Sequence, residues 1–193
     1  MTFKTFYHLR EAKFRESKKV EHLYDLPMFS IFIKEDLLSN PEFIDEEIKI
    51  LVNTKRVRNM FKEARNIITK LGFPSMHANV LFEDLSKDIN PHTNIEGGVG
   101  GYAHKQGKYM SLDLSTLTTN LIVHEWAHLW MFNNTKAFKS AVKEYYKHLQ
   151  DSPLKDELGS YAMANDEELW ATGIEEFLRF PPEHQKSILR LCL

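Results

Sequence analysis

The chain has 193 residues, of which 42% are apolar and 27% are charged, a composition typical of one well-packed globular domain. This composition disfavours disordered, collagen-like and repeat architectures. The 25 lysine and arginine residues nearly balance the 27 aspartate and glutamate residues, giving a net charge of −2. We therefore expect no nucleic-acid partner, because no overall positive field draws the protein toward phosphates.

The single cysteine, Cys192, cannot form a disulfide within the chain and cannot build a cysteine-based zinc finger. The longest apolar runs fall far short of the roughly 18 residues that a membrane-spanning helix needs. Residues 1–30 contain no uncharged apolar segment of the kind found in signal peptides. We therefore expect a soluble, cytoplasmic protein with no membrane partner.

Helical spacing dominates the first part of the chain. Over residues 3–14 aromatic side chains recur among lysines and arginines, which predicts a short amphipathic helix that either packs on the core or docks on a partner protein. Residues 27–33 alternate and are rich in β-formers, so they predict a short strand or a buried loop. A long helix is expected over 40–71, bent near Asn53-Thr54 and ended by Gly72.

The second part of the chain predicts strands and helices together. Residues 77–82 read as a strand, 86–101 as a polar loop, and 102–104 with 109–112 as a hairpin around a glycine-containing turn. Helices are expected over 115–132, 136–150 and 165–180, with a short one after Pro181-Pro182. We predict an α+β fold in a single domain over 1–193, with a mostly helical N-terminal part at 1–75 and a compact core at 76–193.

Residues 124–128 read His-Glu-Trp-Ala-His, which is the H-E-x-x-H pattern of zinc metallopeptidases. Residues four apart on a helix differ by about 40° in direction, so the imidazoles of His124 and His128 can bind one ion. Glu125 is rotated by about 100° from His124, which lets its carboxylate exchange protons beside the ion. The alternative is a pair of core histidines bonded to backbone carbonyls, but it leaves a buried carboxylate without a cation.

A catalytic zinc ion usually takes a third protein ligand. No third histidine stands at the spacing of the extended motifs, so a carboxylate from a later helix is expected. Glu168 is the candidate, with Glu167 and Glu175 as alternatives. Asn165 and Glu168 are also spaced as a capping box, in which the glutamate bonds to the backbone at the start of its own helix. The residues alone leave ligand and cap equally open.

The H-E-x-x-H string, followed by Tyr161-x-x-x-Asn165-x-x-Glu168, resembles the gluzincin metallopeptidases, in particular the minigluzincins and the anthrax lethal factor catalytic domain. The resemblance covers about residues 97–180 and implies a zincin-like fold for the core, with a small mixed sheet, a metal helix and a ligand helix. It implies that Glu168 is the third ligand of a Zn²⁺ ion and that Tyr161 stabilises the oxyanion of the reaction.

The resemblance also implies an edge strand before the metal helix, to which an extended substrate adds as a further strand. Tyr102, Ala103 and His104 are the candidate residues of this substrate edge. One position departs from the family pattern, because Thr172 stands where many gluzincins carry an acidic residue that orients a zinc-bound histidine. Glu175 and Asp113 are possible substitutes for that residue.

The function implied by the resemblance is that of a zinc metalloendopeptidase acting on a peptide or protein substrate. The alternative hypothesis is a structural or assembly protein, such as a virion component of a tailed phage, that keeps the zinc-binding scaffold with weak or no activity. In that case the amphipathic segment at 3–14 would bind the assembly partner, and the protein would be virion-associated. A hydrolase of non-peptide bonds is a third hypothesis.

Overall fold

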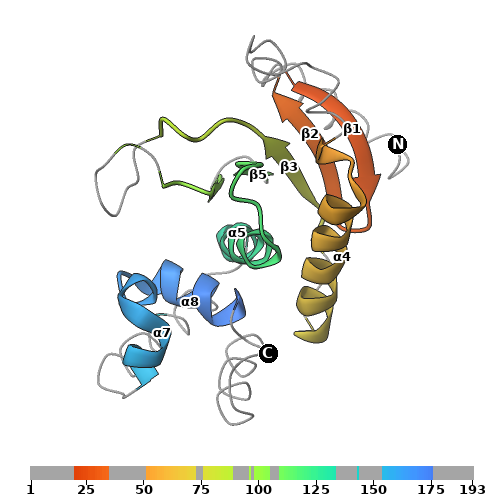
Figure 1. Ribbon diagram of the computed structural model, residues 1–193. Helices are drawn as coiled ribbons and strands as arrows, with labels where there is room; N and C mark the ends of the chain where they lie inside the picture. Colours follow the sequence, from red (N-terminus) through yellow and green to blue (C-terminus); the bar gives the residue numbers. More distant parts are fainter. Residues whose placement is uncertain are drawn as a thin grey trace.

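The structure, a computed structural model, describes residues 20–34, 51–72, 76–88, 96, 98–104, 109–133, 143 and 154–175. The described elements are, in chain order, β1 (Val20–Leu26), β2 (Phe29–Lys34), α4 (Lys55–Lys70), β3 (Ala78–Phe82), β4 (Gly101–Ala103), β5 (Tyr109–Leu112), α5 (Thr119–Phe132), α7 (Leu154–Ala162) and α8 (Asp166–Glu175). Figure 1 shows α4 and α5 beneath the sheet and α8 on the far side of α5. The predicted α+β class is confirmed.

The five described strands form one mixed sheet in the order β1-β2-β3-β5-β4. The central pairs β2–β3 and β3–β5 are parallel, whereas the outer pairs β1–β2 and β4–β5 are antiparallel. Strand β4 therefore lies at an edge of this sheet, and it packs beside α5. The hairpin and the strand expected over 77–82 are confirmed as β4–β5 and β3.

The expectation of a mostly helical N-terminal part is not confirmed over its described residues, because residues 20–34 form the β1–β2 hairpin. Its turn places Met28 at a positive φ of 76°. Of the two structures expected at 27–33, a short strand or a buried loop, the strand is present as β2 from Phe29 on, but β1 was not predicted. After Val20, the residues on both faces of β1 are at least partly exposed. The alternation of apolar and polar residues that would indicate a strand is therefore weak in this segment.

Helix α4 begins after Thr54, whose Oγ1 accepts a hydrogen bond from the backbone N–H of Val57 at 3.3 Å. The helix expected over 40–71 is therefore interrupted at this cap, and residues 35–50 lie outside the described part. Gly72, with a φ of 75°, follows the end of α4 as predicted. The helix packs one apolar stripe on the sheet and on α5.

Helix α5 begins at Thr119, four residues later than expected, because Asp113 holds the preceding turn. Its carboxylate accepts hydrogen bonds from the backbone N–H groups of Ser115, at 2.8 Å, and Leu85, at 3.0 Å. Thr118 then caps the helix by accepting from the N–H of Leu121 at 3.1 Å. The connection from β5 to α5 is thus fixed by short polar side chains.

Helices α7 and α8 follow at the end of the described chain. Helix α7 was not predicted, and Gly159 interrupts it with a φ of 78°. The predicted helix over 165–180 is present as α8 up to Glu175, and its remainder lies outside the described residues. The segments 3–14, 136–150 apart from the helical residue Lys143, and the end after Pro181 also lie outside the described residues. No helix in the described part has the length and hydropathy to cross a membrane.

The main core lies between the sheet and helices α4 and α5, and it continues between α5 and α8. Strand β2 contributes Phe29, Ile31 and Ile33 to it, and β3 and β5 contribute their own inward side chains. Trp126 of α5 is fully buried there. Trp170 of α8 joins the two helices, since its indole N–H donates to the backbone carbonyl of Ala127 at 3.0 Å. This packing fixes α8 against the face of α5 that carries the metal motif.

Candidate metal centre

The two motif histidines lie one turn apart on α5 and share one buried site. His124 and His128 are 6% and 7% exposed, and their Nε2 atoms are 3.1 Å apart. The spacing of four residues accounts for this, because both side chains leave the same face of the helix. The structure thus brings together the pair that the sequence predicts.

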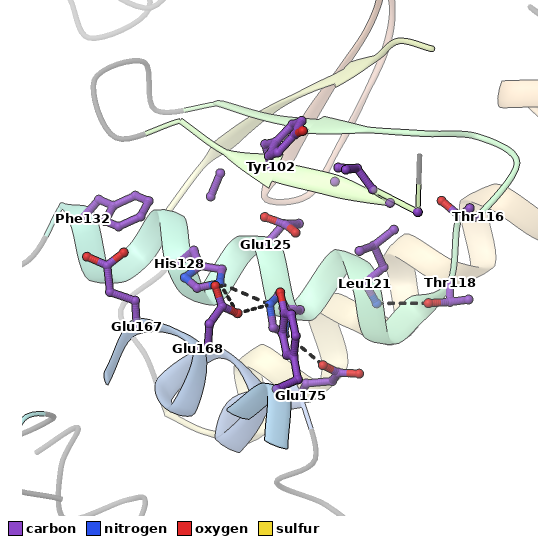
Figure 2. Close-up of a pocket in the computed structure, with 17 residues that line it drawn as sticks. Tyr102, Thr116, Thr118, Leu121, Glu125, His128, Phe132, Glu167, Glu168 and Glu175 are labelled. Carbon is purple, nitrogen blue, oxygen red and sulfur yellow. Dashed lines mark hydrogen bonds and ion pairs between the residues drawn. The ribbon is translucent and has the colours of Figure 1, made fainter. Parts of the chain in front are cut away.

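Glu168 reaches this pair from the first turn of α8. Its Oε2 lies 3.2 Å from Nε2 of His124 and 3.3 Å from Nε2 of His128. Asn165 caps α8, accepting the N–H of Glu168 at 2.9 Å through its Oδ1. The backbone N–H of Glu168 thus takes part in the helix cap, whereas its carboxylate lies beside the two histidines (Figure 2).

The three ligand atoms form a nearly equilateral triangle with sides of 3.1, 3.2 and 3.3 Å. Ligands about 2.0–2.1 Å from a tetrahedral zinc ion are separated by about 3.3 Å, so the donor set fits such an ion. Two imidazoles and one carboxylate are also a ligand set that catalytic zinc takes. Within the described residues, this is the one group of three whose side chains could hold a metal ion.

Hydrogen bonds couple the ionisation of His124 to that of Glu168. Burial lowers the pKa of His124, but hydrogen bonds to Glu168 and Glu175 outweigh it and raise the pKa to about 9. Burial alone would raise the pKa of Glu168, but its hydrogen bonds with the two histidines hold that pKa well below the usual value. The site therefore favours an ionised carboxylate facing a positive charge.

Glu125 points from α5 toward strand β4, away from the triad (Figure 2). It is 6% exposed, and burial raises its pKa, while the neighbouring histidines and a hydrogen bond from the backbone N–H of Ala103 oppose that rise. Gly101 leaves room for this side chain, because a Cβ at that position would lie 2.9 Å from Cγ of Glu125. Strand β4 thus sets the position of the buried carboxylate.

Tyr161 lies at the rim of the site, with its ring centroid 5.9 Å from that of His124. Burial raises the pKa of its hydroxyl, and the charge of Glu168, to which the hydroxyl is hydrogen-bonded, raises it further. The residue remains 48% exposed and borders the cleft. The predicted tyrosine therefore reaches the triad, while its hydroxyl stays protonated at neutral pH.

A cleft of about 830 Å³ runs between β4 and the two site helices. Tyr102 and Ala103 of the predicted substrate edge line it, together with the backbone of the preceding glycines. His104 is not among the lining residues. Its ring stacks on Tyr109 at 3.9 Å, and its Nε2 lies 2.9 Å from Oγ of Ser111, so this side chain belongs to the sheet face that points away from α5.

The two candidates for the missing acidic residue differ in position. Oε2 of Glu175 lies 3.0 Å from Nδ1 of His124, so this carboxylate takes the predicted place beside the metal motif. Asp113 instead bonds to backbone groups before α5 and is not directed at the histidines. Glu167 lines the cleft, but the metal triad is completed by Glu168.

Two residues that position the site were missed from sequence. Gly101 was assigned to a loop, although its position directly before the predicted strand was a usable signal for a close backbone approach. Trp170, which ties α8 to α5, gave no signal because its partner is a backbone carbonyl 43 residues away.

No protein-family model, curated protein or solved structure matches the chain. The assignment of this centre therefore rests on its own residues and geometry.

Proposed function

We propose that the protein is a zinc-dependent metallopeptidase of the gluzincin type, with His124, His128 and Glu168 as the residues that hold the ion. The observation that carries this proposal is the convergence of three buried ligand atoms at spacings that suit tetrahedral zinc, with Glu125 lining the same cleft. A bound zinc ion supplies Lewis acidity and lowers the pKa of water to about 7.

Glu125 acts as the general base and then as the general acid. Its carboxylate takes a proton from the attacking water and delivers it to the amine nitrogen as the peptide bond breaks, which balances the hydrolysis. Burial supports this role, because it raises the pKa of Glu125 and makes the carboxylate a better proton acceptor. The Ala103 N–H holds the side chain between β4 and the triad.

Tyr161 donates a hydrogen bond to the carbonyl oxygen of the substrate as negative charge develops there. Its raised pKa supports this role, because the hydroxyl keeps its proton at neutral pH. The partial exposure of the ring allows a substrate to reach the hydroxyl from the cleft.

The substrate is an extended peptide that adds to the edge of β4 on which no described strand lies. The N–H of His104 donates to the carbonyl of Tyr109, and the carbonyl of Gly100 accepts from the N–H of Asp113, so by the alternation of an antiparallel pair Gly101 and Ala103 turn their backbone groups away from β5. The Ala103 N–H already donates to Glu125, so the Ala103 carbonyl and the backbone groups of Gly101 are the ones that would pair with a substrate. Such groups recognise a peptide backbone irrespective of its sequence. Tyr102 borders the same edge. The backbone of His104 pairs with β5, and its side chain takes no part in the cleft.

The E125Q variant tests this function. It removes the proton acceptor and keeps the size of the side chain, so turnover of a peptide library is expected to fall by about 10²–10⁴-fold or more, with one zinc ion per chain retained. E63Q on α4 is the matched control, since glutamine can still accept the bond from Thr119. Retained peptidase activity in E125Q would overturn the mechanism, and absence of a transition metal in the wild type would overturn the zinc site.

The same assay distinguishes a peptidase from a structural or assembly protein in which the zinc-binding domain serves only as a scaffold. Wild-type protein that binds zinc, cleaves no peptide and enters a larger particle would favour a structural or assembly role. The segment at 3–14 that would bind such a partner lies outside the described residues.

A further inference from the structure

His124 is held through both of its ring nitrogens. Its Nε2 faces the ligand triangle, 3.2 Å from Oε2 of Glu168, while its Nδ1 lies 3.0 Å from Oε2 of Glu175. An imidazole that binds a metal ion through one nitrogen is neutral and carries its single hydrogen on the other nitrogen, and an ionised carboxylate only accepts hydrogen bonds. Glu175 therefore fixes the hydrogen on Nδ1 and leaves the lone pair on Nε2 directed at the ligand triangle.

The helical periodicity of α8 explains why Glu175 can do this. Residues seven apart lie two turns apart on almost the same side of a helix, so Glu168 and Glu175 both face α5. Thr172 lies on the turn between them, where its short side chain carries no acidic group. Its Oγ1 is buried and has no hydrogen-bond partner in the part of the chain that the structure describes.

The second histidine lacks this support among the described residues. Nδ1 of His128 is buried there without a hydrogen-bond partner, in contrast to Nδ1 of His124. Among the described residues, the outer nitrogen of one motif histidine is therefore held by a carboxylate and that of the other is not. An outer partner of this kind sets both the direction and the basicity of a metal-bound imidazole.

We infer that Glu175 is the positioning residue of the metal centre and that it acts by orienting His124. It does so from a place on α8 about one turn after Thr172. This inference rests on the proposed zinc function. It predicts that zinc affinity, and not only turnover, depends on a carboxylate delivered from this side of α8. It also predicts that an acidic residue at position 172 can replace Glu175.

The test measures zinc affinity by competition with a chromogenic chelator, and records the visible spectrum of the cobalt-substituted protein. E175A is expected to weaken zinc binding by about 10–100-fold and to shift the cobalt spectrum. E175Q keeps an amide oxygen that accepts the Nδ1 hydrogen, so it is expected to lose less than about tenfold. The double variant T172D/E175A is expected to regain most of the lost affinity.

D166N is the matched control, because it removes one negative charge from α8 two positions before Glu168, on the opposite side of the helix. It is expected to bind zinc like the wild type. Thermal unfolding of each metal-free variant verifies folding. Should E175A not fold, E175D replaces it, because its shorter side chain withdraws the carboxylate from Nδ1.

The outcomes separate the two claims. Unchanged affinity and an unchanged cobalt spectrum in folded E175A or E175D, alongside a wild type that binds zinc, would overturn the positioning role and leave the proposed function intact. An equal loss of affinity in D166N would also overturn it, because the effect would then be one of general charge. A wild type that binds no zinc would overturn the proposed function itself.

Discussion

Helices α4 and α5 lie side by side beneath the same sheet, but they are buried in different ways (Figure 1). Both begin at a threonine whose hydroxyl accepts a backbone N–H three residues on. Helix α4 then buries a single stripe, Val57, Phe61, Ala64 and Ile68. Helix α5 instead buries ten consecutive residues from Ile122 to Met131, including its two histidines and Glu125.

The difference follows from position. Helix α4 has the core on one side and all its lysines and arginines except the half-buried Arg58 exposed on the other, where charge costs little. Helix α5 lies between the sheet and α8, so its polar side chains are withdrawn from water and need partners. They find them in Glu168, Glu175 and the backbone of β4. The site is therefore marked by polar side chains that are buried, and not by polar side chains in general.

The largest expected effect concerns the ligands of α5. H128A removes one of three ligand atoms, so we expect elemental analysis to find no stoichiometric zinc in the purified variant. K62A changes an exposed charged residue of α4, and we expect it to keep its zinc and to change stability by less than about 0.5 kcal/mol. A full complement of zinc in H128A would show that the ion is bound elsewhere.

The stripe of α4 is expected to govern stability instead. Phe61 is 1% exposed, and its ring packs against Phe29 and Phe82 at centroid distances of 5.1 and 6.3 Å. F61A should lower the free energy of unfolding in urea by about 3–5 kcal/mol through the cavity it leaves. The folded fraction should still bind one zinc ion per chain. A loss below about 1 kcal/mol would contradict the assignment of Phe61 to the core.

A smaller effect is expected where β4 meets α5. The Cβ in G101A would lie 2.9 Å from Cγ of Glu125 and 3.0 Å from the carbonyl oxygen of Ser111, so the carboxylate must shift. We expect kcat/KM to fall by about 10²-fold with unchanged zinc affinity, because a small displacement of a catalytic group is costly.

G72A is the control for this variant. Gly72 has a positive φ, a Cβ there meets no atom within 4 Å, and the residue lies outside the cleft. We expect G72A to lower stability by about 1 kcal/mol and to leave activity unchanged. Wild-type activity in G101A would show that β4 does not set the position of Glu125.

Several features could be predicted because they depend on neighbouring residues. The pair His124 and His128 follows from helical spacing, and the β4–β5 hairpin and β3 follow from alternating apolar residues. The start of α5 was misplaced, because Asp113 bonds to Leu85, a residue 28 positions earlier that no local pattern indicates. Strand β1 was missed for a similar reason, since its pairing with β2 stabilises a segment whose own alternation is weak.

The sequence by itself determined the two histidines, the adjacent glutamate and the helix that carries them, because one turn of helix fixes their relative directions. Only the tertiary structure distinguished Glu168 as a partner of these histidines from Glu168 as a cap, since both roles use the same spacing from Asn165. Packing of α8 on α5 decided that question. The same packing brought Glu175 to His124, across a separation of 51 residues that no local pattern spans.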